Sequence, residues 1–137
     1  MSAPHVLLIE DDPFESVLAT RALKRLLPDI HITLLRNGQE FLDYLDMRSG
    51  DDDAVLALMD LHMPAMGGLE LLEALAERQL RPPFPVIVFS SSEDPREISR
   101  AYALGAAAFV TKPIDPARYR LAVQHITNFW LSTNRLR

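Results

Sequence analysis

Apolar residues along the chain follow two alternating patterns. Apolar runs recur five times. Four of them are continuous over four to six residues, and the one at residues 30–35 is interrupted by His31 and Thr33. Near-continuous runs are typical of strands buried on both faces of a parallel sheet. Between them, apolar residues recur at intervals of three and four, which is the period of a helix with one buried stripe. The pattern predicts strands at residues 5–9, 30–35, 54–59, 86–89 and 107–110, and helices at residues 13–27, 39–47, 69–78, 95–104 and 116–131.

Aspartate–proline pairs mark the start of three of these helices. They are Asp12-Pro13, Asp94-Pro95 and Asp115-Pro116, and an Asp cap followed by Pro at the first helical position favours helix initiation. Strands and helices that alternate with short loops indicate right-handed crossovers and a parallel sheet covered on both faces. The 137 residues, 48% of them hydrophobic, suit a single domain over residues 1–137.

Composition narrows the functional classes. The net charge of -5 argues against a nucleic-acid partner. The absence of cysteine excludes disulfides and thiolate chemistry and fits a cytoplasmic location. No apolar run approaches the roughly 20 residues that span a membrane, and no signal peptide is visible.

Polar side chains follow four of the predicted strands. Ligands bind at the carboxyl ends of the strands in open α/β sheets, so these side chains converge on one crevice if their strands are neighbours. They are Glu10, Asp11 and Asp12 after the first strand, Asp60 after the third, Ser90 after the fourth and Lys112 after the fifth.

This set of residue types indicates phosphoryl transfer onto a carboxylate. Two carboxylates about 4 Å apart repel by roughly 4 kcal/mol at an effective dielectric constant of 20, so the cluster needs Lys112 and a divalent cation. Carboxylate ligands with several waters are what Mg²⁺ prefers. No glycine-rich phosphate loop is present, which leaves Asp60 as a nucleophile, with Ser90 and Lys112 binding phosphoryl oxygens.

The order and spacing of four motifs resemble the receiver domain of two-component response regulators. The resemblance covers almost the whole chain and rests on Glu10-Asp11, Asp60, Ser90 and Lys112-Pro113. It implies an α/β, doubly wound, five-stranded parallel sheet of strand order 2-1-3-4-5 with five helices, a flavodoxin-like fold.

The resemblance also implies a role for each residue. Asp60 accepts a phosphoryl group from a sensor histidine kinase. Asp11, Asp60 and the backbone carbonyl of His62 ligate Mg²⁺, and Glu10 acts through a metal-bound water. Lys112 pairs with the acceptor and then with its phosphate, and the Lys112–Pro113 peptide bond is expected to be cis, as in only about 5–6% of Xaa-Pro bonds.

Two assignments keep alternatives. The acidic pair is Glu10 and Asp11 because Asp12 suits a helix cap, and the alternative pair is Asp11 and Asp12. In the family, the residue matching Ser90 moves toward the phosphoryl group while an aromatic on the fifth strand swings inward. The matching aromatic is Phe109, which is equally well placed to be ordinary core.

The last helix carries more apolar surface than one buried stripe needs. Leu121, His125 and Phe129 form a second line, with Trp130 beside them; they are either stray exposed side chains or a dimer face. The Phe129-Trp130-Leu131 ending and the segment 94–104 are similar to response regulators paired with bacterial phytochrome kinases. Members of that subgroup commonly form dimers, so we expect a homodimer through this helix and a phytochrome kinase as partner.

Taken together, these observations predict a stand-alone receiver without an output domain, which acts as a switch and not as a conventional enzyme. One alternative is a receiver-like scaffold that is never phosphorylated and works through its last helices. Another is a metal-dependent phosphatase with Asp60 as nucleophile, in which His62 stands where an acid is expected. His5, His31 and His125 show no metal-ligand spacing and are predicted to be structural or surface residues.

Overall fold

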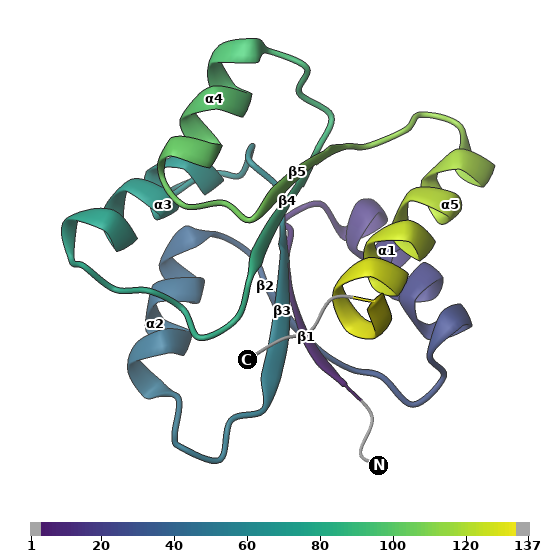
Figure 1. The fold of residues 1–137 in the computed structure, drawn as a ribbon, viewed down its shortest axis with the longest axis horizontal. Helices are drawn as coiled ribbons and strands as arrows, with labels where there is room; N and C mark the ends of the chain where they lie inside the picture. Colours follow the sequence, from purple (N-terminus) through teal and green to yellow (C-terminus); the bar gives the residue numbers. More distant parts are fainter. Residues whose placement is uncertain (1–3, 134–137) are drawn as a thin grey trace.

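The computed structural model describes residues 4–133. Five parallel strands form one sheet in the order β2-β1-β3-β4-β5 (Figure 1). The strands are β1 His5–Ile9, β2 His31–Leu35, β3 Ala54–Met59, β4 Val86–Ser90 and β5 Ala108–Thr111. The helices are α1 Pro13–Leu26, α2 Gly38–Met47, α3 Gly68–Glu77, α4 Pro95–Ala103 and α5 Pro116–Thr127, which continues into a π-helical segment, Asn128–Thr133.

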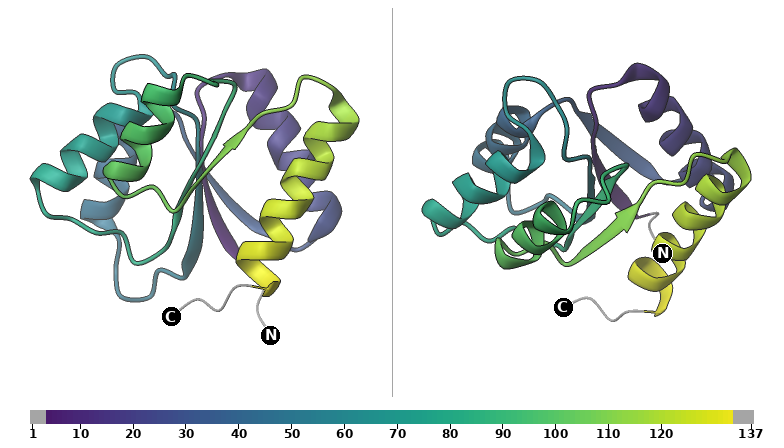
Figure 2. Two further views of the ribbon diagram at one scale, coloured as in Figure 1. Left: turned by 45° about the horizontal axis from the view of Figure 1, so that its top comes forward. Right: turned by 90° about the horizontal axis from the view of Figure 1, so that it is seen from above.

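Helices cover both faces of the sheet. Helices α1 and α5 lie on one face, and α2, α3 and α4 lie on the other (Figures 1 and 2). Side chains of β1 alternate between the two cores: Val6 and Leu8 pack toward α1 and α5, whereas Leu7 and Ile9 pack toward the opposite helices. The predicted doubly wound fold and its strand order are confirmed.

The central strands of the sheet are more deeply buried than the edge strands. All five residues of β1 and of β4 are buried, as expected for strands with neighbours on both sides. Strands β2 and β5 are the edges of the sheet and are only partly buried. Asp12, Asp94 and Asp115 each accept hydrogen bonds from backbone N–H groups at the start of a helix, as predicted.

One local prediction is refined and another is wrong. The last helix extends through residue 131 as predicted, but it is α-helical only to Thr127 and π-helical from Asn128 to Thr133. The Lys112–Pro113 bond is not cis: every peptide bond among residues 4–133 is trans. The trans form of an Xaa-Pro bond is favoured by about 0.5–1 kcal/mol, and with it the Lys112 ammonium already reaches the carboxylates described below.

Within the described residues, no helix is both long enough and apolar enough to cross a membrane.

Candidate functional site

The sheet register brings the predicted site residues together at the carboxyl end of the sheet. Ile9 of β1 pairs with Met59 of β3, so the residues that follow them, Glu10 and Asp60, leave the sheet side by side. The Asp60 N–H donates to the carbonyl oxygen of Ile9 at 3.0 Å. On the other side, the Lys112 N–H donates to the Ser90 carbonyl oxygen at 2.8 Å.

Three carboxylates form an acidic cluster at the carboxyl end of the sheet. Oxygen atoms of Glu10, Asp11 and Asp60 all lie within 4.8 Å of one another. Such a set of oxygen donors fits a hard divalent cation with water in its other positions. Asp12 lies outside the cluster: its side chain accepts from the N–H groups of Phe14 and Glu15 and caps α1. The structure therefore groups the first acidic pair, not the alternative pair, with Asp60.

Lys112 supplies the positive charge of the site. Its Nζ lies 2.7 Å from Glu10 Oε1 and 3.6 Å from Asp60 Oδ2, and all three side chains are buried. A third carboxylate, Glu15 on the first turn of α1, lies 3.1 Å from the same Nζ. The sequence interpretation did not include Glu15, because an acid in the first turn of a helix is common for its interaction with the helix dipole alone.

Burial changes how these groups titrate. It raises the pKa of Glu10 to about 7, although the hydrogen bond from Lys112 acts in the opposite direction. Burial alone would lower the pKa of Lys112, but the hydrogen bond to Glu10 and the charge of Asp60 hold it above its ordinary value. Lys112 therefore stays charged near neutral pH, and Glu10 is the group that takes up a proton as the pH falls below 7.

The loop after β3 packs tightly around Asp60. Asp60 Oδ1 accepts from the N–H of Leu61 at 2.8 Å. A Cβ on Gly68 would lie 2.8 Å from the carbonyl oxygen of Asp60 and 3.0 Å from Leu61 Cα, so only glycine fits there without a shift. This close approach fixes the Asp60 backbone, while Oδ2 is the oxygen that faces Lys112.

Ser90 ends β4 and is fully buried. Its Oγ accepts from the N–H of Ser92 at 3.3 Å. The Ser92 hydroxyl donates to Glu97 on α4, and the same carboxylate lies 3.4 Å from Nε2 of the exposed His62. The structure thus links the loops after β3 and β4 through Glu97, a contact that no spacing in the sequence indicated. The role of the His62 backbone carbonyl as a metal ligand stays a prediction.

Phe109 lies on the edge strand β5 and is half-buried against the core beneath α3 and α4. Its N–H donates to the hydroxyl of Tyr102 on α4 at 3.0 Å. This geometry joins α4 to β5, and it fits both an aromatic that can change position and an ordinary core side chain. The switch role therefore stays a prediction.

The predicted interface residues lie on α5 and the π-helical segment. Leu121 and Phe129 are about half exposed, at 48% and 49%, and His125 is also exposed. Trp130 is half-buried, packs against the core next to α5 and contacts the Phe129 ring edge-on, with centroids 5.1 Å apart. The predicted line of exposed side chains is present, and Trp130 packs against Phe129 and the core and is not part of the exposed line. That a second chain covers this line stays a prediction.

Comparisons with known proteins agree with this site. The sequence profile of the response regulator receiver domain matches residues 6–124. The probable methanogenesis regulatory protein FilR2 of Methanothrix harundinacea is 30% identical over 132 residues, which cover 95% of this chain and 85% of that protein. Response regulator Rcp1 of Synechocystis is 28% identical over 131 residues, which cover 93% of this chain and 89% of Rcp1.

Two crystal structures extend the comparison. The Mn²⁺-bound form of Rcp1 superposes with a TM-score of 0.81 and 28% identity, over 98% of this chain and 99% of that chain. The phosphorylated cyanobacterial phytochrome response regulator RcpA superposes with a TM-score of 0.87 and 28% identity, over the same shares of the two chains.

A doubly wound sheet with an acidic cluster and a buried lysine at its carboxyl edge defines the class of receiver domains. The chain belongs to the response regulator receiver family, and it is similar in sequence and structure to phytochrome-associated response regulators. Receiver domains are generally not conventional enzymes.

Proposed function

We propose that this receiver is a Mg²⁺-dependent phosphoryl acceptor that takes its phosphoryl group on Asp60 from a sensor histidine kinase. One observation carries the proposal: the buried Lys112 ammonium lies 2.7 Å from Glu10 and 3.6 Å from Asp60, which are two of the three carboxylates of the acidic cluster. A scaffold that is never phosphorylated has no use for this costly concentration of buried charge.

Glu10, Asp11 and Asp60 would hold the cation, with the His62 carbonyl as a further predicted ligand. Their oxygens lie close enough to share one ion, and Mn²⁺ is bound in the structure of the similar protein Rcp1. When bound, the cation neutralises negative charge that develops on the phosphoryl oxygens.

The chain's own residues account for the transfer. An oxygen of Asp60 attacks the phosphorus of a phosphohistidine on the kinase; the O–P bond forms as the P–N bond breaks, and the histidine nitrogen keeps the electron pair. Lys112, held by Glu10 and Glu15 beside Asp60, would donate to one of the phosphoryl oxygens. The Ser90 hydroxyl at the end of the neighbouring strand donates to another.

Phosphorylation needs an element with two states if it is to signal. We assign this role to Ser90 and Phe109, as the family resemblance implies. The Tyr102 hydroxyl, which accepts from the Phe109 N–H at 3.0 Å, gives the switch a route to α4. Movement of β5 would break or remake this bond and so reposition the exposed face of the helix.

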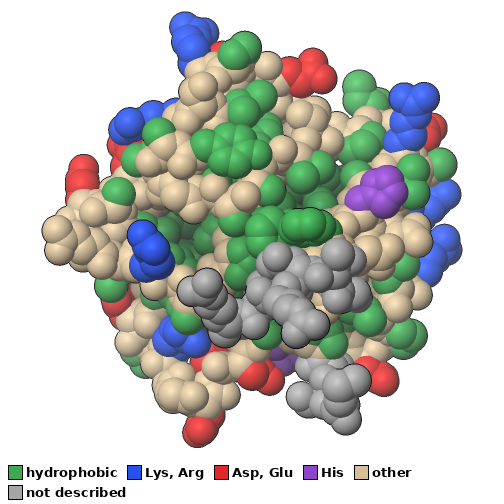
Figure 3. All heavy atoms as spheres, viewed as in Figure 1, with side chains coloured by type: hydrophobic (Ala, Val, Ile, Leu, Met, Phe, Trp, Pro, Cys, Tyr) green, Lys and Arg blue, Asp and Glu red, His purple; other side chains and the backbone are tan. Residues whose placement is uncertain are grey.

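The likeness to RcpA supports a phytochrome kinase as the partner. Figure 3 shows apolar side chains gathered on the face where β5 lies between α4 and α5. Exposed Tyr102 lies on α4, and exposed Phe129 lies on the π-helical segment that continues α5. Leu121 and His125 continue the line along α5. We propose that a second copy of the chain covers this region. The cytoplasmic location stays a prediction.

Intact-mass measurement after incubation with acetyl phosphate tests the function. We expect one phosphoryl adduct on the wild type, which depends on Mg²⁺ and is absent from Asp60→Asn. The adduct should be base-labile, as an acyl phosphate is. If no adduct forms and beryllofluoride does not bind either, fast hydrolysis is excluded and the scaffold alternative replaces the proposal.

Size-exclusion chromatography of the same samples tests the interface. We expect a dimer that Leu121→Glu dissociates. The control is Leu34→Glu, which changes an exposed leucine on the edge strand β2, away from α5, and should leave the dimer intact. A wild type that is monomeric with and without phosphate would contradict the homodimer and leave the phosphoacceptor proposal standing.

A further inference from the structure

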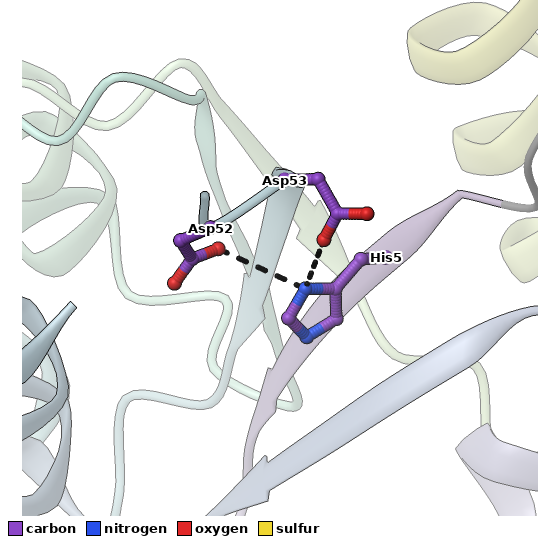
Figure 4. Close-up of side chains that lie close together, drawn as sticks. All are labelled: His5, Asp52 and Asp53. Atoms are coloured by element: carbon purple, nitrogen blue, oxygen red, sulfur yellow. Dashed lines mark hydrogen bonds and ion pairs between the residues drawn. The ribbon is translucent and has the colours of Figure 1, made fainter. Parts of the chain in front are cut away.

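A second group of ionisable side chains lies at the amino-terminal end of the sheet, opposite the acidic cluster. His5 begins β1, and Asp52 and Asp53 directly precede β3 (Figure 4). His5 Nδ1 lies 3.0 Å from Asp53 Oδ1 and 3.8 Å from Asp52 Oδ1. One ligand atom from each residue lies within 4.8 Å of the other two.

The His5 ring is buried and held from two sides. Only 6% of the residue is exposed. Its Nε2 lies 2.8 Å from the Thr33 hydroxyl, and the His31 ring stacks on it with a centroid distance of 4.2 Å. Both contacts come from β2. In the tautomer in which Nε2–H donates to Thr33, Nδ1 presents a lone pair to the two carboxylates, and a cation between them stabilises this arrangement. In the other tautomer, Nδ1–H donates to Asp53 Oδ1 at 3.0 Å.

We propose that His5, Asp52 and Asp53 bind a divalent transition-metal ion, for which Zn²⁺ is the best fit. Zinc binds imidazole nitrogen and carboxylate oxygen at about 2.0–2.2 Å, so two ligands of a tetrahedral site lie roughly 3.3 Å apart. The two distances from Nδ1, 3.0 and 3.8 Å, lie on either side of this value. An imidazole donor favours zinc over Mg²⁺, whereas three carboxylates favour the reverse.

The surroundings of the ligands support the same assignment. Metal-bound histidines almost always donate through their second ring nitrogen, as His5 does to Thr33 in this tautomer. Asp52 Oδ1 also accepts from the Ala54 N–H at 2.9 Å, and its Oδ2 accepts from the Tyr44 hydroxyl. These bonds fix the carboxylate and leave Oδ1 turned toward the ring (Figure 4).

Charge and space at the site also suit a divalent cation. A surface hollow of about 370 Å³ is lined by the three proposed ligands and by His31, Tyr44 and Asp51, among others, which leaves room for water to complete the coordination. The carboxylates of residues 51–53 face one guanidinium there, that of Arg48, whose Nε lies 3.6 Å from Asp52 Oδ2. A net negative charge therefore surrounds the proposed ion.

Zinc titration of the full chain by calorimetry tests the site. The titrations use the Asp11→Asn background, which removes a carboxylate of the other cluster. We expect one Zn²⁺ per chain in this background, with affinity at least tenfold weaker when Asp53→Asn is added. Asp53 is 67% exposed, so the change leaves the fold intact. Asp51→Asn, an identical charge change in the same hollow, serves as the control and should bind as the background does.

Nitrogen-15 NMR of the histidine rings identifies the ligand atom. Zinc should shift the Nδ1 resonance of His5 before those of the other three histidines. The proposal is overturned if the Asp11→Asn chain binds no zinc, if Asp53→Asn and Asp51→Asn bind equally well, or if zinc shifts another histidine first. A His5 ring that is doubly protonated and unaffected by zinc would identify a plain ion pair with Asp53.

Discussion

Replacing Lys112 with methionine removes the ammonium group that contacts Glu10 and Asp60 of the acidic cluster, at nearly constant side-chain volume. At an effective dielectric constant of about 20, its attraction to Asp60 across 3.6 Å is roughly 5 kcal/mol, and that to Glu10 across 2.7 Å is roughly 6 kcal/mol. These gross values are offset by the cost of burying the charges. Removing one partner of a buried ion pair costs a net of about 3–5 kcal/mol.

We expect the lower end of this range for Lys112→Met, because Glu10 can take up a proton and relieve part of the repulsion. A loss of about 3 kcal/mol corresponds to a fall in Tm of roughly 10 °C for a domain of this size. Mg²⁺ should reduce the loss by at least about 1 kcal/mol, since the variant no longer repels the cation with a lysine. An ion at 100 times its Kd adds about 2.7 kcal/mol to the free energy of unfolding.

Urea unfolding with and without Mg²⁺ measures both effects. The matched control is Lys24→Met, at the only other lysine of the chain, which is exposed on α1 and should change stability by less than about 0.5 kcal/mol. The reasoning is refuted if Lys112→Met is within about 1 kcal/mol of the control without Mg²⁺, or if Mg²⁺ stabilises both variants equally.

Variants of the adjacent carboxylates Asp11 and Asp12 should separate cation binding from helix capping. Asp11→Asn should abolish the stabilisation by Mg²⁺, whereas Asp12→Ala should lower the free energy of unfolding by about 1 kcal/mol and keep the affinity for Mg²⁺. Urea titrations that show the reverse pattern would contradict the assignment. Because the pKa of Glu10 is raised to about 7, its burial costs stability as the pH rises from 4.5 through 7 in the absence of metal. The affinity for Mg²⁺ should fall as the pH drops below 7, by up to tenfold per pH unit. Glu10→Gln should flatten this pH dependence in calorimetric titrations. An unchanged pH profile in the variant would contradict the assignment of the dependence to Glu10. Gly68→Ala should cost about 1–3 kcal/mol by crowding the acceptor loop, measured against Gly50→Ala, whose Cβ meets nothing within 4 Å; equal stability of the two variants would show that the loop relaxes freely.

The sequence predicted those features that depend on local pattern. Continuous apolar runs predicted four of the five strands to within one residue at each end, because buried parallel strands leave little room for polar side chains. The run at the edge strand β2 is interrupted by His31 and Thr33, and it also predicted its strand to within one residue. Asp–Pro pairs gave three helix starts. Alternation of strands and helices, with the family resemblance, gave the strand order that the structure confirms.

The features that sequence reasoning missed depend on tertiary contacts. Glu15 contacts Lys112 only in the folded chain, because the two residues are 97 positions apart in the sequence. Glu97 joins Ser92 to His62 across two loops. His5, interpreted as structural or surface, meets Asp53 48 residues further on. No spacing in one sequence reports such distances.

Local geometry was also beyond the pattern. The change to π-helical geometry after Thr127 leaves the apolar periodicity of the last helix almost unaltered. The isomer of the Lys112–Pro113 bond leaves no trace in composition, and the resemblance alone suggested cis. The two isomers of an Xaa-Pro bond differ by only about 0.5–1 kcal/mol, so the surrounding structure decides which one forms.

Locating the phosphoryl group tests the central claim most directly. Borohydride reduces an acyl phosphate of aspartate to homoserine, and tandem mass spectrometry of proteolytic peptides then identifies the position. After incubation with acetyl phosphate and Mg²⁺, we predict homoserine at position 60 and at no other carboxylate of the cluster. Homoserine at position 11, or a phosphoryl group that resists reduction because it sits on Ser90 or His62, would contradict the account of Asp60 as the acceptor.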